Sequence, residues 1–112
     1  MRVTSALWVA AYVRRAFVEG AFAAVTRRGA QEAGAIFVVV DRLDGMFDLY
    51  GQAPQSAFGT DRPSDRLFTL VEGAVDRERL AARIASETRF DPDLWVVELE
   101  QKTGDPLLDL VE

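Results

Sequence analysis

The chain has 112 residues, of which 49% are hydrophobic and 28% are charged, and its formal net charge is -5. This size and composition are typical of one folded domain that buries a core without disulfide bonds. The negative charge disfavours binding to nucleic acid or to an anionic membrane surface, because both partners require a positive field on the protein.

Two residue types that carry much of enzyme chemistry are missing. The sequence has no histidine and no cysteine, so it lacks the side chain that most often moves protons near neutral pH and any thiol nucleophile. Ser-His-Asp catalysis, Cys-His catalysis and the usual zinc sites are therefore excluded for the chain by itself. We predict no cofactor and no metal, and a cysteine-free chain suits the reducing cytoplasm.

The first predicted element is a helix from Thr4 or Ser5 to about Glu19. A hydroxyl residue at the start can cap the helix, and Gly20 ends it. The polar side is narrow, so we expect the helix to be largely buried. The residues that we assign to its inner face by helical spacing are Leu7, Trp8, Ala11, Tyr12, Arg15 and Val18.

No targeting or membrane segment is predicted. Arg14-Arg15 interrupts the apolar start of the chain after only a short run, which disfavours a cleaved secretion signal. No stretch approaches the roughly 20 apolar residues of a membrane-spanning helix. We therefore expect a cytoplasmic protein that does not bind a membrane.

A short strand at 22–28 precedes a predicted β-hairpin. Asp44-Gly45 lies between the apolar runs 35–43 and 46–52, and this dipeptide favours a two-residue turn. Both faces of the hairpin carry apolar residues, so we expect the sheet to be covered on both sides for part of its length. The turn predicts three facing pairs, namely Val40 with Leu49, Val39 with Tyr50 and Asp41 with Asp48.

The second half of the chain predicts a loop, a strand, a helix and a strand. The loop at 52–65 is rich in Gly, Pro, Ser and Gln. The strand runs from Arg66 to Glu72 and ends at Gly73, the helix spans 75–88, and the last strand spans 94–100, followed by a short apolar tail. This order predicts a single α+β domain over residues 1–112, with one mixed, mostly antiparallel sheet of about five strands and two main helices.

Several stretches resemble a known family. They are Leu7-Trp8-Val9 followed by Arg14-Arg15, Arg27-Arg28-Gly29 followed by Ala33-Gly34-Ala35-Ile36, Leu43-Asp44-Gly45, and the run from Phe90 to Glu98, FDPDLWVVE. The chain is similar over nearly its whole length to the bacterial family called domain of unknown function 1491, which is typical of alphaproteobacteria. The resemblance implies a small single domain of mixed α and β structure, and it implies no catalytic residue because the family has no established activity.

The FDPDLWVVE run contains the first group of candidate site residues. Asp91 and Asp93 lie close together, and Glu98 and Glu100 share one face of the following strand. Carboxylates of this kind can hold a hard cation such as Mg²⁺. We favour a plainer interpretation, a turn whose carboxylates accept bonds from backbone amides, because no metal-binding spacing is matched.

The predicted hairpin places a second pair of carboxylates, Asp41 and Asp48, opposite each other. Facing like charges destabilise a sheet, and such a pair could hold a cation or share a proton. A solvated hairpin end with Arg42 nearby is the interpretation that we favour.

Arginines form the third candidate, an anion or phosphate site. We assign it to Arg27, Arg28 and Arg66, since guanidinium groups match phosphate oxygens. Ordinary surface pairing with the abundant acids is the alternative. A phosphate-binding loop is not predicted, because no glycine-rich stretch ends in Gly-Lys-Ser/Thr.

The loop that follows the hairpin is the fourth candidate, for contact with a ligand or a partner. Irregular loops with amides, a hydroxyl and aromatic ends often collect such contacts. The residues that we assign to this site are Tyr50, Gln52, Gln55, Ser56 and Phe58.

Two classes of function remain open. The first is a non-catalytic cytoplasmic domain that binds an unknown protein partner or forms a homo-oligomer, which the high apolar fraction favours. The second is a small ligand-binding or anion-binding protein, or an enzyme based on carboxylates and arginines, that uses the 52–58 loop. Nucleic-acid binding is disfavoured by the net charge.

Overall fold

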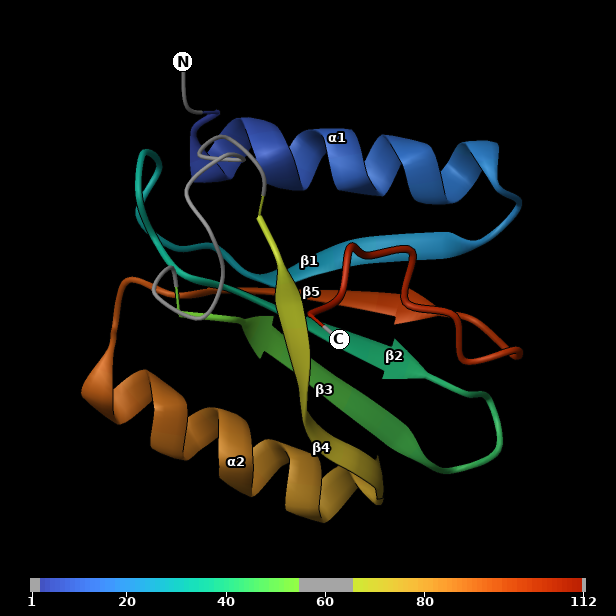
Figure 1. Cartoon of the computed structure of the whole chain (residues 1–112). Helices are drawn as coiled ribbons and strands as arrows, with labels where there is room; N and C mark the ends of the chain where they lie inside the picture. Colours follow the sequence, from blue (N-terminus) through green and yellow to red (C-terminus); the bar gives the residue numbers. More distant parts are fainter. Residues whose placement is uncertain (1–2, 55–65, 112) are drawn as a thin grey trace.

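The computed structural model describes residues 3–54 and 66–111. In chain order the elements are α1 (Ser5–Val18), β1 (Phe22–Arg27), β2 (Ile36–Asp41), β3 (Phe47–Gln52), β4 (Phe68–Val75), α2 (Arg77–Phe90) and β5 (Trp95–Glu100). Within this described part, the strands form one sheet in the order β1-β5-β2-β3-β4 (Figure 1). Only β2 and β5 run parallel among the paired strands there, so the predicted α+β fold with a mostly antiparallel sheet is confirmed.

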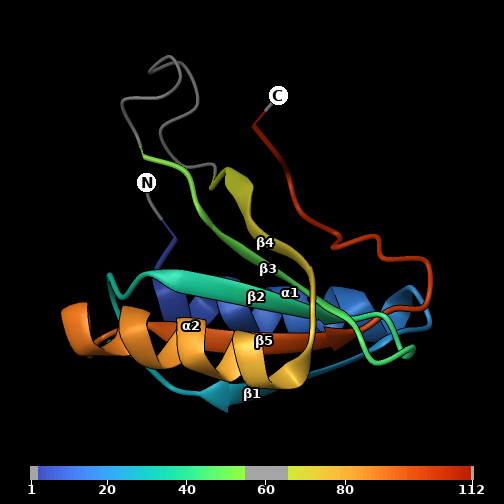
Figure 2. The same cartoon turned by 90° about the horizontal axis from the view of Figure 1, so that it is seen from below.

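The two helices cover opposite faces of the sheet (Figures 1 and 2). Successive residues of a strand point to opposite faces, and β2 shows this clearly. Val38 and Val40 pack in the core beneath α1, whereas Val39 packs in a second core with Leu80 of α2. The expected cover on both faces is therefore confirmed for the centre of the sheet.

Helix α1 has the predicted bounds but a different buried face. The Thr4 hydroxyl caps it by accepting a hydrogen bond from the Leu7 amide at 3.2 Å, and Glu19 closes it. The fully buried residues are Ser5, Val9, Tyr12 and Ala16. The predicted inner face was wrong for Leu7, Ala11, Arg15 and Val18, which are exposed, and the helix is not largely buried as expected. Apolar residues surround most of this helix, so their spacing does not single out one face.

The hairpin register differs by one residue from the prediction. Val39 faces Leu49, Val40 faces Asp48 and Asp41 faces Phe47. Positive φ angles occur at Leu43 and Gly45 rather than at Asp44-Gly45, and the Arg42 amide donates to the Met46 carbonyl at 3.1 Å. The loop therefore contains three residues, which is the next commonest hairpin length.

Strand β4 continues past the predicted end at Gly73. It reaches Val75 through a bulged stretch in which Ala74 has a φ of 52°. The Ala74 amide donates to Oδ1 of Asp48 at 2.8 Å, so a neighbouring strand satisfies the irregular backbone. Helix α2 then starts two residues later than the predicted start at Val75, with Asp76 as its cap.

The C-terminal tail joins the sheet face that α1 covers. Phe68 pairs with Leu110 in an isolated parallel bridge, and its amide donates to the Asp109 carbonyl at 2.9 Å. Leu107 and Leu108 pack against the same core as α1. One face of the sheet is thus covered by two elements, the helix α1 and the tail, which leave a seam between them.

Candidate functional site

The predicted loop site is only partly visible in the described chain. Gln55, Ser56 and Phe58 lie outside the described residues. Tyr50 is buried in the core beneath α1, where burial raises the pKa of its phenol. Oε1 of Gln52 accepts a hydrogen bond from the Ile36 amide at 2.7 Å. Both described members of this group therefore hold the fold together.

The three predicted anion-binding arginines have different surroundings. Arg27 donates to the Pro92 carbonyl at 2.7 Å, and the Arg28 guanidinium lies 5.3 Å from the centre of the Trp95 indole. Arg66 is buried and donates to the Val3 carbonyl at 2.6 Å. A hollow of about 560 Å³ is lined by Arg66 and Gln52 but not by Arg27 or Arg28. The structure thus brings Arg66 of the predicted anion site next to Gln52 of the predicted loop site. A site built from all three arginines stays a prediction.

The acidic turn after α2 forms a structural joint. Oδ1 of Asp91 accepts a hydrogen bond from the Asp93 amide at 3.1 Å, and the Asp93 carbonyl accepts one from Ala30 at 2.9 Å. A Cβ atom on Gly29 would lie 2.2 Å from that carbonyl oxygen, and one on Gly34 would lie 2.4 Å from it. Across residues 3–54 and 66–111, no group of acidic side chains could hold a metal ion.

The predicted carboxylate pair in the hairpin does not form. Asp48 faces Val40 and is almost fully buried. Its two carboxylate oxygens accept hydrogen bonds from Arg42 at 2.8 and 2.9 Å. Asp41 instead accepts a bond from the Leu43 amide at 2.8 Å. The pairing was wrong because the register differs by one residue, which places the two carboxylates on opposite faces of the hairpin. The favoured interpretation of a solvated hairpin end was wrong for Asp48, which is buried.

The outer face of α1, away from the sheet, is apolar and uncovered in the described part of the chain. Leu7 is 59% exposed and Val18 is 79% exposed. They line a surface groove with the residues between them, which are Ala10, Ala11, Arg14 and Arg15. Phe17 is also exposed and packs edge-on against the exposed Phe22, with ring centres 5.6 Å apart. Large apolar groups thus lie on the outside of a helix that also buries Val9 and Tyr12 on its inside.

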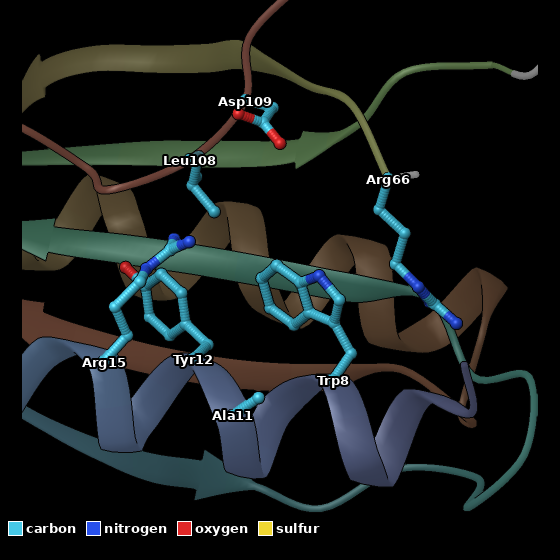
Figure 3. A pocket seen from close by; sticks show the side chains of 7 residues that line it. All are labelled: Trp8, Ala11, Tyr12, Arg15, Arg66, Leu108 and Asp109. Carbon is cyan, nitrogen blue, oxygen red and sulfur yellow. The ribbon is translucent and has the colours of Figure 1, made fainter. Parts of the chain in front are cut away.

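A pocket opens in the seam between α1 and the tail (Figure 3). This seam pocket has a volume of about 270 Å³, and its lining residues are Trp8, Ala11, Tyr12, Arg15, Arg66, Leu108 and Asp109. The rings of Trp8 and Tyr12 stack with centres 5.2 Å apart and an angle of 10° between their planes. Sequence analysis missed this site because it depends on where the tail folds back, although Trp8 and Tyr12 were correctly placed on one helix.

Burial and hydrogen bonding hold Tyr12 in the wall of the seam pocket. Its hydroxyl donates to the Pro106 carbonyl at 2.7 Å. Burial raises the pKa of the phenol well above its ordinary value of 10.0, and the nearby Arg15 only partly offsets this rise. The residue therefore stays neutral and acts as a fixed apolar wall rather than as an acid or a base.

Comparisons with known proteins point to one family and to no activity. The family model described as "Protein of unknown function (DUF1491)" matches residues 3–109. A solution structure of a protein from A. tumefaciens is 46% identical, with a TM-score of 0.86, and the match covers 100% of this chain and 97% of that one. No curated protein matches.

Two further structures are of a DUF1491 family protein from Caulobacter crescentus. The crystal structure is 33% identical with a TM-score of 0.78, and the match covers 100% of both chains. The NMR structure is 33% identical with a TM-score of 0.79, and the match covers 100% of this chain and 99% of that one. No helix in residues 3–54 and 66–111 has the length and apolar character needed to cross a membrane.

Proposed function

The chain belongs to the DUF1491 family, whose description assigns no activity, and we propose that it is a non-catalytic cytoplasmic domain that binds another protein through the outer face of α1. Absence of histidine and cysteine from the sequence supports a binding role over a catalytic one. We propose the cytoplasm because a chain without cysteine cannot form the disulfide bonds that oxidising compartments allow.

One observation carries the proposal, namely the large apolar side chains on the outer face of α1. The helix buries Ser5 and Ala16 completely, while Leu7 and Val18 lie in water. A helix that only covers a sheet gains stability by turning its large apolar side chains inward. Exposed apolar residues that form a continuous patch are typical of interaction surfaces. The outer face of α1 therefore has the properties of a surface that a partner covers.

The charges beside this patch indicate the kind of partner. Arg14 and Arg15 flank the apolar groove, and neither forms an ion pair with any described residue. This is notable in a chain with 18 acidic and 13 basic residues, where internal acidic partners are abundant. The complementary surface is an apolar stripe with flanking Asp or Glu side chains, such as one face of an amphipathic acidic helix.

Site-specific photo-crosslinking in living cells tests the proposal. A photoreactive residue replaces Val18, and in a matched control it replaces Phe90, which is 88% exposed at the end of α2. We expect a single heterologous partner to be captured from position 18 but not from position 90. The captured segment should be apolar with flanking acids, and Arg14→Glu should abolish its capture.

Three results would contradict the proposal. They are a crosslink to a second copy of the chain, equal capture from both positions, and no product from position 18. Leu7→Ser combined with Val18→Ser separates binding from folding. Both residues are exposed, so each change should alter stability by less than about 0.5 kcal/mol while removing the partner.

A further inference from the structure

We infer that the seam pocket binds one small zwitterion, a free α-amino acid with an apolar side chain. The seam pocket adjoins the partner-binding face of α1 and shares Ala11 and Arg15 with it, but the inference does not depend on the protein partner. It rests on the opposite charges that line the pocket, on the aromatic wall and on the volume.

Charges of both signs line the seam pocket, and Arg15 and Asp109 do not pair with each other. Arg15 comes from α1 and Asp109 from the tail, and they lie apart on its walls (Figure 3). The described residues form no ion pair with either side chain. The guanidinium of Arg15 and the backbone of Asp109 are nevertheless held in place. Arg15 donates one N–H to the Leu107 carbonyl, and the backbone carbonyl of Asp109 accepts the Phe68 amide at 2.9 Å.

The aromatic wall is rigid and supplies one further donor. Trp8 stacks on Tyr12 and lies 5.3 Å, centre to centre, from the ring of Phe68. The Tyr12 hydroxyl is engaged by Pro106. Among the described residues, no acceptor bonds the Trp8 indole N–H, and Figure 3 shows this nitrogen on the side of the ring that faces Asp109. Arg66 contributes to the far wall, while its guanidinium is bound to Val3.

These groups match the three parts of an apolar amino acid. The guanidinium of Arg15 binds the α-carboxylate, as guanidinium forks do. The carboxylate of Asp109 accepts hydrogen bonds from the α-ammonium, and the rings with Leu108 contact the side chain. A simple anion is repelled by Asp109, and a simple cation is repelled by Arg15. A ligand with both charges satisfies both walls.

The volume limits the size of the ligand. Pockets for drug-sized molecules usually enclose roughly 300 to 1,000 Å³, and the seam pocket encloses about 270 Å³. That space accepts one amino acid but is too small for a nucleotide or a folded peptide. The aromatic wall favours aliphatic or aromatic side chains over polar ones.

Titration of the full chain with L-leucine tests the inference. Trp8 fluorescence reports occupancy, because Trp95 is buried and donates to the Ala30 carbonyl at 2.8 Å, away from this pocket. Two probes of the same shape lack one charge each: 3-methylbutylamine lacks the carboxylate, and 4-methylpentanoate lacks the amine. We expect each to bind at least about tenfold more weakly than leucine, since hydrogen bonds to charged groups carry at least that much free energy.

Variants identify the groups responsible. Arg15→Gln and Asp109→Asn should each weaken leucine binding at least about tenfold, whereas Arg89→Gln, on an exposed part of α2, should not change it. Trp8→Phe should remove the fluorescence change on leucine binding, since only Trp95 then remains. Calorimetry provides a second readout of binding that does not depend on tryptophan fluorescence. Equal binding of leucine and its one-charge analogues would overturn the inference. So would the absence of heat and fluorescence change with all common amino acids at millimolar concentration, or leucine affinity unchanged by Arg15→Gln and Asp109→Asn.

Discussion

Gly29→Ala should destabilise the protein strongly, although the usual effect of this substitution is the reverse. Gly29 does not have a φ in the left-handed region, and at such positions alanine normally stabilises by about 0.4 to 1 kcal/mol by restricting the unfolded chain. Here the added Cβ would lie 2.2 Å from the Asp93 carbonyl oxygen and 2.6 Å from the Leu94 carbonyl carbon. Both are backbone atoms, so no side-chain rotation relieves the contact.

The cost follows from what must move. The entrance to β5 has to shift by about 1 Å to restore an ordinary contact, and overpacking of this kind costs roughly 1 to 3 kcal/mol. The shift also strains the hydrogen bond from Ala30 to Asp93, at 2.9 Å, and loss of such a bond costs about 1 kcal/mol more. We expect a loss of about 3 kcal/mol, which lowers the melting temperature by roughly 10 °C or more.

Thermal unfolding followed by circular dichroism measures this loss. Gly45→Ala is the matched control, because Gly45 has a φ of +89° and no atom within 4 Å of the added Cβ. It tests backbone conformation without crowding and should cost only about 1 kcal/mol. A Gly29→Ala protein that melts at or above the temperature of the parent would show that the close backbone contact does not constrain this joint.

Three further predictions concern stability. Arg42→Gln leaves the buried Asp48 carboxylate without its charged partner, so urea denaturation should show a clearly lowered midpoint; an unchanged midpoint would mean that water reaches Asp48. Ser5→Ala should cost about 1 to 3 kcal/mol because it leaves the Gly34 carbonyl without its 2.6 Å bond, whereas Leu7→Ser should cost under about 0.5 kcal/mol. Urea denaturation compares the two variants, and equal losses of stability for Ser5→Ala and Leu7→Ser would contradict the observed orientation of α1. Burial raises the pKa of Tyr12 above the value near 10 in the unfolded chain. Its contribution to stability is therefore complete below about pH 10 and falls as the pH rises further, so Tyr12→Phe should flatten the alkaline decline in a pH series of melting temperatures, and an unchanged slope would contradict this.

Local signals predicted the elements well. The bounds of α1 followed from a hydroxyl cap and Gly20, and the strand and helix order followed from the spacing of apolar residues. Apolar residues on both faces of β2 also indicated correctly that both faces of the sheet are covered. These features depend on backbone preference and on the sequence nearby, which a single chain displays directly.

Tertiary contacts determined what the sequence did not predict. The hairpin register depends on Asp48, which is held in the interior by Arg42 and by Ala74 of β4. Which face of α1 turns inward depends on Ser5, whose hydroxyl donates to the distant Gly34 carbonyl. Neither contact is visible in the local pattern, because each partner lies on another element. The seam pocket was missed for the same reason, since the tail that closes it folds back onto Phe68.

The stretches on which the family resemblance rests contain residues of two kinds: Leu7, Trp8, Arg14 and Arg15 belong to the proposed binding surfaces, whereas others only hold the fold together. Gly29 and Gly34 pack closely against the Asp93 carbonyl, which also accepts a hydrogen bond from Ala30. These residues hold the fold together. Asp109 and Val18 point away from the core and contribute little to it. A substitution in the joint should impair folding together with every activity, whereas a substitution at Asp109 or Val18 should remove one kind of binding and leave the fold intact. Measuring both folding and binding for these variants therefore separates the residues that bind partners or ligands from those that maintain the fold.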